Sequence, residues 1–251
     1  MADHGATRLC RAATRYWDAR AFWGRIVENA RTLCGAACVH LAHDPAARDD
    51  VVRWGCLAFA VASKHFLRRE RGIDRASLAG VIGGGEVEEM ASAAHPPLWA
   101  AERARRAGAC GLAVHAETPA GVGAQRSAAL AAISAKIDAL VGQVGGMERI
   151  RGTPLPLVYV AHLRAFLLVL LVALGPLWEQ YLGWGTIPAV SLVAAAFLGI
   201  DAAAVECEAP FSAGSINHLN QDGACMLILS NVEQTLALAA AGADGNCAAV
   251  A

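Results

Sequence analysis

The sequence contains few charged residues, and it has no lysine or arginine after Arg164. Charged residues make up 17% of its 251 residues and hydrophobic residues 56%, whereas charged residues account for about 25% of an average soluble domain. The first 164 residues carry 21 cations against 15 acids, a net charge of +6, and the remainder carries seven acids and no cation. This composition favours a membrane protein whose two parts differ in charge.

The sequence also lacks the cysteine pattern of a disulfide-rich protein and the leader of a secreted one. Its eight cysteines are scattered and include no Cys-x-x-Cys pair, and the chain is too long and too apolar for a small disulfide scaffold. We expect most of them to be buried thiols in a reducing compartment. No basic segment followed by an apolar one opens the chain, so we predict no cleavable secretory signal.

No arrangement of residues typical of catalysis is present. The run Gly83-Gly84-Gly85 is not followed by the Gly-Lys-Ser/Thr of a phosphate-binding loop. His40 and His43 stand three residues apart at a helix end, but no acidic or cysteine partner accompanies them at a metal-binding spacing. We therefore predict neither an enzyme nor a metal site. Because acids accompany the cations of the basic helices at similar density, we also expect no nucleic-acid binding.

Hydrophobic periodicity indicates an all-α fold. Apolar residues recur at intervals of three, four and seven over residues 7–41, 45–71 and 127–146, which predicts three amphipathic helices. Residues 72–125 contain clustered glycines and prolines, so we expect short helices and irregular segments there. Together these elements predict a helical, mainly cytosolic domain over residues 1–152.

Two apolar runs follow this domain. As helices of about 1.5 Å rise per residue, residues 156–178 and 186–205 are each long enough to cross about 30 Å of hydrocarbon. We predict a transmembrane helical hairpin over residues 153–205, with a soluble hairpin that forms a buried core as the alternative. An aromatic belt is expected where a hairpin turns at the membrane surface. Three aromatic residues bracket the turn: Trp178, Tyr181 and Trp184.

The distribution of charge orients this hairpin. Arg149, Arg151 and the basic helices before them precede the first apolar run, and basic segments stay on the cytoplasmic side of a membrane. A hairpin returns the chain to the side from which it entered. Residues 206–251 are therefore expected to form a cytosolic tail.

Three ionisable side chains lie inside the apolar runs: His162, Arg164 and Asp201. Such groups are costly in hydrocarbon and usually face a partner, a cavity or the interface. Snorkelling explains Arg164 as well as a functional role does. Asp201 lies near a helix C-terminus, where an acid is electrostatically unfavourable, and this favours a functional role.

Several segments, in their order along the chain, resemble the successive signatures of bestrophin-type anion channels, especially the bacterial and plant or algal branch. The resemblance runs from about Arg8 to Glu233 and rests on these segments: RYWDARAFWGRIV, GGMERIRGTPLPLVYVAHL, GWGTIP, FLGIDAAAVECEAPF and NHLNQDGAC. It implies a homopentamer in a lipid bilayer that conducts chloride or other monovalent anions passively through a central pore. The family's first membrane helix and its hydrophobic neck are expected to have no counterpart in this chain.

The same resemblance assigns a cytosolic aperture to Leu155, which Pro154 and Pro156 flank. The prolines fix φ and supply no N–H, so they stiffen the turn. A ring of five apolar side chains there would form a dry constriction that passes weakly hydrated anions more readily than strongly hydrated ones.

A third implication concerns the acidic segment after the second apolar run, which resembles the calcium clasp of animal bestrophins. Four of the oxygen-bearing residues are retained: Glu206, Glu208, Asn217 and Asp222. His218 stands where an acid usually follows the asparagine, and Ca²⁺ requires six to eight oxygen ligands. We therefore expect a vestigial clasp and no calcium or other cofactor.

Two alternatives to a channel function remain open. In the first the chain is a truncated, non-conducting subunit, and in the second it is an all-α membrane-associated scaffold. As a channel it is expected in the plasma membrane, or in a plastid thylakoid membrane if the source is photosynthetic.

Overall fold

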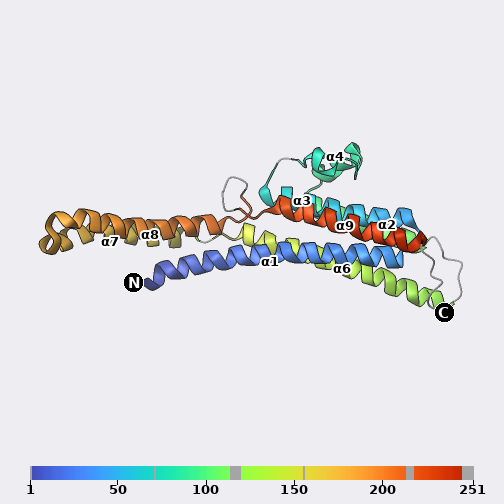
Figure 1. The fold of residues 1–251 in the computed structure, drawn as a ribbon, viewed down its shortest axis with the longest axis horizontal. Coiled ribbons are helices and arrows are strands. Elements are labelled where there is room, and N and C mark those ends of the chain that lie inside the picture. Colours follow the sequence, from blue (N-terminus) through green and yellow to red (C-terminus); the bar gives the residue numbers. More distant parts are fainter. Residues whose placement is uncertain (1, 71, 114–119, 155, 213–217, 245–251) are drawn as a thin grey trace. The chain divides into compact units, whose positions relative to one another are not determined.

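A computed structural model describes residues 2–70, 72–113, 120–154, 156–212 and 218–244 (Figure 1). Within these residues every regular element is a helix, which confirms the predicted all-α fold. By their contacts the residues divide into two compact units. The hairpin unit comprises Met1–Arg20 and Arg149–Leu219, and the helical unit comprises Ala21–Glu148 and Asn220–Ala251.

The long amphipathic helices are confirmed. Helix α1 (Ala2–His40) begins before the predicted residues 7–41 and ends one residue short of them, and α6 (Ala120–Gly152) extends beyond the predicted 127–146 at both ends. Helix α2 (Pro45–Val52) begins at a cap that the sequence specifies. The carboxylate of Asp44 accepts a hydrogen bond of 3.0 Å from the Ala47 N–H, and Pro45 occupies the first helical position, where no N–H is needed.

The predicted helix over residues 45–71 is present, but it is not one uninterrupted α-helix. Between α2 and α3 (Phe59–Arg68) lies a π-helical segment, η1 (Arg53–Ala58), which contains the buried side chains of Trp54 and Cys56. A π turn adds one residue to a helical turn, and hydrophobic periodicity does not reveal it. Helix α3 ends where Arg69 adopts a left-handed conformation with φ of 57°.

The region 72–125 is more regular than its composition predicts. It contains the short elements η2 (Arg75–Leu78) and α4 (Gly84–Ser92), but also α5 (Pro96–Ala113), an 18-residue helix that packs against α2, η1 and α3. The core lies here. The twelve largest fully buried side chains of the described residues all fall between Ile26 and Met147, inside the helical unit.

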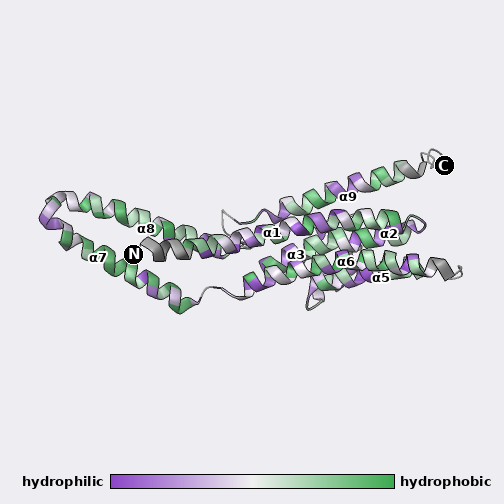
Figure 2. Cartoon of the chain, turned by 90° about the horizontal axis from the view of Figure 1, so that it is seen from below, coloured by the Kyte–Doolittle hydropathy of each residue, from purple (hydrophilic) through white to green (hydrophobic). Residues whose placement is uncertain are grey.

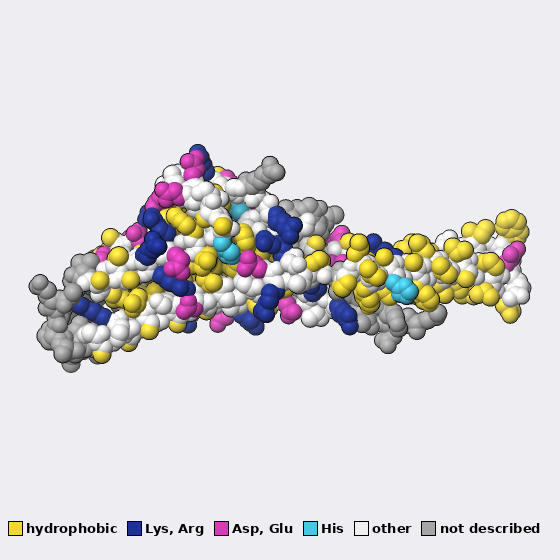
Figure 3. Space-filling view, turned by 180° about the vertical axis from the view of Figure 1, so that it is seen from behind, with side chains coloured by type: hydrophobic (Ala, Val, Ile, Leu, Met, Phe, Trp, Pro, Cys, Tyr) yellow, Lys and Arg dark blue, Asp and Glu magenta, His cyan; other side chains and the backbone are white. Residues whose placement is uncertain are grey.

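The predicted membrane hairpin is formed by α7 (Leu157–Leu182) and α8 (Thr186–Glu208), which pack against each other and are joined by η3 (Gly183–Gly185). In the most apolar 18-residue stretch of this pair, only 6% of the residues are buried. Figure 2 colours most of α7 and α8 as hydrophobic, and in Figure 3 hydrophobic side chains cover most of the visible face of this pair. A soluble hairpin would bury these side chains, so the exposed apolar surface supports the membrane hairpin over the soluble alternative.

A further helix, α9 (Gln221–Asp244), lies in the predicted tail and was not foreseen from the sequence. The side chain of Asn220 caps it by accepting a hydrogen bond of 2.8 Å from the Gly223 N–H. Helix α9 packs against α3 and η1 in the helical unit. By length and composition, segments Gly123–Gly152 and Gln221–Ala241 are, like the hairpin, apolar enough to cross a membrane.

Candidate functional site

The chain entering the proposed aperture is held by an arginine from a distant part of the sequence. In the hairpin unit, Arg15 of α1 donates from Nη1 to the carbonyl oxygen of Thr153 at 2.7 Å and from Nη2 to that of Ile150. Thr153 in turn hydrogen-bonds the Arg149 carbonyl through its backbone N–H at 3.1 Å and its hydroxyl at 2.6 Å. The last turn of α6 is thus fixed immediately before Pro154.

Leu155, the predicted aperture residue, lies outside the described residues. The chain is described again at Pro156, which has φ of −56° and ψ of 126° and stands directly before α7. This extended conformation agrees with a proline that opens a helix. The assignment of the aperture to Leu155 stays a prediction.

Two of the three ionisable residues noted inside the apolar runs are paired with each other. Arg164 of α7 and Asp201 of α8 form an ion pair with 3.0 Å between Nε and Oδ2. Pairing lowers the cost of placing both charges in an apolar hairpin, and it joins the two helices across 37 positions of sequence. The pairing of Arg164 with Asp201 was not foreseen from the sequence. His162 is exposed on α7.

The residues predicted to form a vestigial clasp belong to different units. Glu206 and Glu208 lie in the last turn of α8 in the hairpin unit, whereas Asp222 lies in the first turn of α9 in the helical unit. Asn217 lies outside the described residues. Whether these residues bind calcium stays a prediction. No group of three or more histidine, cysteine or acidic side chains suited to a metal ion occurs among the described residues.

Asp222 instead contacts two buried cations of α3, and we call this cluster the α3–α9 clamp. Its carboxylate accepts hydrogen bonds from Lys64 Nζ at 3.0 Å and from Arg68 Nη2 at 2.7 Å. Arg68 Nε also donates to Gln221 Oε1 at 2.8 Å. Partial burial opposes ionisation of Asp222, but the hydrogen bonds from Arg68 and Lys64 outweigh it and lower its pKa to about 2.

The sequence signals for this clamp were weak. Lys64 and Arg68 were visible as part of a basic run at the end of a helix, and such runs are usually solvated. Their side chains are nevertheless only 8% and 9% exposed. The available clue was the segment Asn220-Gln221-Asp222, in which a capping residue and an acid precede an apolar run, as at a helix N-terminus.

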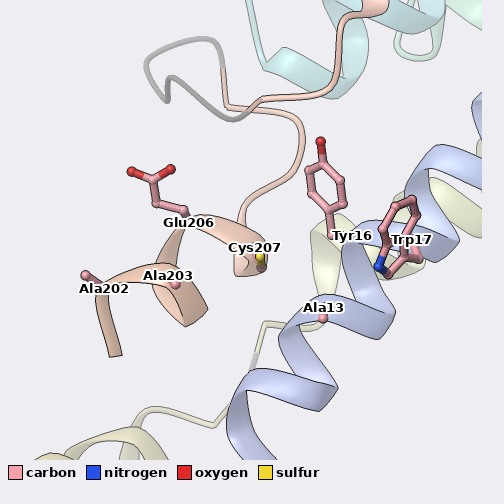
Figure 4. Close-up of a pocket in the computed structure, with 7 residues that line it drawn as sticks. All are labelled: Ala13, Tyr16, Trp17, Ala202, Ala203, Glu206 and Cys207. Atoms are coloured by element: carbon pink, nitrogen blue, oxygen red, sulfur yellow. The ribbon is translucent and has the colours of Figure 1, made fainter. Parts of the chain in front are cut away.

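A cavity of about 530 Å³ adjoins the end of α8 in the hairpin unit. Tyr16 and Trp17 of α1 line one side, and small residues together with Glu206 and Cys207 of α8 line the other. In Figure 4 the Glu206 carboxylate is turned away from the two aromatic rings. The cavity is therefore mainly apolar, and its one acid is not arranged with the rings to hold a cation.

The histidine pair at the end of α1 has a structural partner. His43 Nε2 lies 3.3 Å from the carbonyl oxygen of Gly111 in α5, and His40 ends α1. This contact ties the α1–α2 turn to α5 within the helical unit.

Comparison with known proteins gives matches along nearly the whole chain. The family model for the bacterial and fungal bestrophin proteins matches residues 10–234. A voltage-dependent anion channel-forming protein of Nostoc is 30% identical over 235 residues, which are 90% of this chain and 71% of that protein. Another of the same description from Mesorhizobium japonicum is 33% identical over 236 residues, 90% of this chain and 68% of that protein.

Solved structures show the same fold. Two structures of a bacterial bestrophin homologue from Klebsiella pneumoniae, one of them carrying a point mutation, superpose with TM-scores of 0.82. Both alignments cover 94% of this chain and 83% of the other, at 24% and 23% identity.

Proposed function

The chain belongs to the bacterial and fungal bestrophin family, and we propose that it forms a pentameric channel through which chloride and other monovalent anions cross a membrane passively. The observation that carries this proposal is that two proteins named for forming anion channels align with 90% of the chain. A channel of this kind performs no covalent chemistry, so we assign no catalytic residue.

The distribution of apolar and charged residues supports this proposal. The exposed apolar surface of α7 and α8 suits a lipid environment. All 21 cations lie at or before Arg164, and a basic vestibule raises the local concentration of anions near a pore entrance. We place the helical unit on the cytoplasmic side, because basic segments stay there, and the hairpin in the plasma membrane, or in a thylakoid membrane if the source is photosynthetic.

We propose that Leu155 forms the narrowest cytosolic part of the pore. It is flanked by Pro154 and Pro156, which restrict the backbone and leave few conformations to the residue between them. Five leucine side chains around an axis offer no hydrogen bonds to an ion, so an anion must shed part of its hydration shell to pass. Iodide sheds water more easily than chloride and should pass faster.

Halide flux from liposomes tests this function. The full chain is purified as an oligomer of defined size and reconstituted, and chloride and iodide efflux are compared with those of Leu155→Ala. We expect efflux from the wild type with iodide faster than chloride, and faster but less discriminating efflux from the variant. An assembled pentamer that passes no halide would establish a non-conducting subunit, and release of the chain from membranes by carbonate would establish a peripheral scaffold.

We propose that calcium does not regulate this channel. In the α3–α9 clamp the carboxylate of Asp222 already binds Lys64 and Arg68, and a bound Ca²⁺ there would have to displace or repel these two cations. Halide efflux is therefore expected to be the same with calcium as with a chelator. A change of efflux that saturates with calcium concentration would overturn this proposal.

A further inference from the structure

The C-terminus of α6 poses a hydrogen-bonding problem that the following residues cannot solve. The last carbonyl groups of a helix have no intrahelical partner, and N–H groups just downstream usually satisfy some of them. Two of the three residues after Thr153 are prolines, which have no N–H. The carbonyls of Ile150 and Thr153 therefore need a donor from elsewhere.

Arg15 supplies these donors. Its two terminal nitrogens contact the carbonyl oxygens of Thr153 and Ile150, so one planar guanidinium spans the last turn of α6. A cation also interacts favourably with the negative end of the helix dipole. A lysine has one compact ammonium group in place of this fork and cannot hold two separated carbonyls in the same way.

Packing around Arg15 restricts its side chain. The Nε atom is buried and has no hydrogen-bond partner, which is unfavourable by itself. The hydrogen bonds of the two terminal nitrogens offset this loss. In the helical unit the same two helices are in close contact, since a Cβ at Gly146 of α6 would overlap the ring of Phe22 of α1. Both contacts leave little freedom for α6 to slide along α1.

We infer that Arg15 is a positioning residue for the proposed aperture: it fixes the end of α6 and so sets where the chain leaves this helix, immediately before Pro154 and Leu155. This inference rests on the proposed function, because it assumes that Leu155 lines the pore. Arg15 touches no permeating ion in this scheme. It acts through the backbone at Ile150 and Thr153.

A double-mutant cycle in the full-length oligomer tests the inference, with the iodide-to-chloride efflux ratio as the readout. The four proteins are the wild type, Arg15→Gln, Leu155→Ala and the double variant. We expect Arg15→Gln to reduce the ratio in the wild-type background and to change it little when Leu155 is already alanine. The two substitutions should thus be coupled by at least about twofold. Arg15→Lys should give an intermediate ratio.

The matched control is Arg20→Gln, which removes the same charge from the same helix. Arg20 stacks over the ring of Trp17 at 5.4 Å and should leave the ratio unchanged. The inference is overturned if assembled Arg15→Gln keeps the wild-type ratio, if its effect adds independently to that of Leu155→Ala, or if both Arg15 variants fail to assemble, since Arg15 would then act on folding. If Leu155→Ala alone leaves the ratio unchanged, the aperture assignment fails instead.

Discussion

At the scale of single residues, the most informative side chain is Asp222. Its contacts with Lys64 and Arg68 give this acid a structural role in place of the metal-binding role that its motif suggests. As part of an acidic segment it resembles a metal ligand. In the structure it neutralises Lys64 and Arg68, whose side chains are largely buried. Buried cations without a counter-ion are strongly destabilising, so the clamp fastens the start of α9 to α3.

Substitution of this carboxylate is expected to weaken the docking of α9. Asp222→Asn keeps the shape but removes the charge that pairs with Lys64 and Arg68, although Arg68 keeps an ion pair of 3.8 Å with Glu70. Because Asp222 is itself 56% exposed, we expect a modest loss of about 1–2 kcal/mol in the free energy of unfolding, seen as a lower Tm in detergent. Glu233→Gln, at an exposed acid on the same helix, is the control and should leave the Tm unchanged.

The pH dependence of this effect follows from the lowered pKa. A carboxylate with a folded pKa of about 2, against about 3.9 when unfolded, stabilises the fold fully above the unfolded value and loses this contribution as the pH falls through the folded one. The Tm difference between the wild type and Asp222→Asn should be constant from neutral pH to about pH 4 and shrink below it. A difference that vanished near neutral pH would contradict the pairing.

At the scale of the helices, the packing of α5 depends on glycine at one position and tolerates change at another. A Cβ added at Gly111 would overlap that of Ala47 and come within 3.1 Å of Leu41 Cδ2, whereas at Gly108 the nearest atoms would be 3.5 Å away. Backbone-attached atoms such as the Cβ of Ala47 cannot move aside without shifting a helix.

Two alanine substitutions on α5 are therefore expected to differ. Gly111→Ala should separate α2 from α5 and lower the free energy of unfolding by about 1–3 kcal/mol. Gly108→Ala should be neutral or slightly stabilising, because alanine also favours the helix. Thermal unfolding of the two purified variants measures the difference, and equal Tm values would show that α2 and α5 are not closely packed.

The elements predicted correctly are those whose signal lies in a long stretch of sequence. The 3.6-residue period of apolar residues predicted helices α1 and α6. The length of the two apolar runs and the aromatic residues between them predicted helices α7 and α8. The π turn at Arg53–Ala58 and helix α9 were missed. A π turn depends on tertiary packing, and the apolar surface of α9 continues around the helix instead of forming one stripe.

The candidate site was less predictable for the same reason. Motif comparison led to Leu155, yet the contacts that the structure adds, Arg15 with the end of α6 and Arg164 with Asp201, join positions 37 to 138 residues apart. Arg164 was visible as a charge inside an apolar run, whereas Arg15 was one of several arginines of a basic helix. Their partners are backbone carbonyls in one case and a distant helix in the other, and neither leaves a local pattern.

At the scale of the whole molecule, a helical unit with a buried core occurs in one chain with a hairpin whose apolar surface is exposed. The exposed apolar hairpin contributes to the small fraction of charged residues in the chain. An exposed apolar hairpin fits the family membership, because a channel needs a segment that lies in the membrane.

The reversal potential of the reconstituted channel tests the central claim most directly. The purified oligomer is placed in a planar bilayer that separates two KCl solutions of different concentration, and the voltage of zero current is measured. We predict a reversal potential close to the chloride equilibrium potential, which shows that anions carry the current. A reversal potential near that of potassium, or no current from an assembled oligomer, would contradict the account.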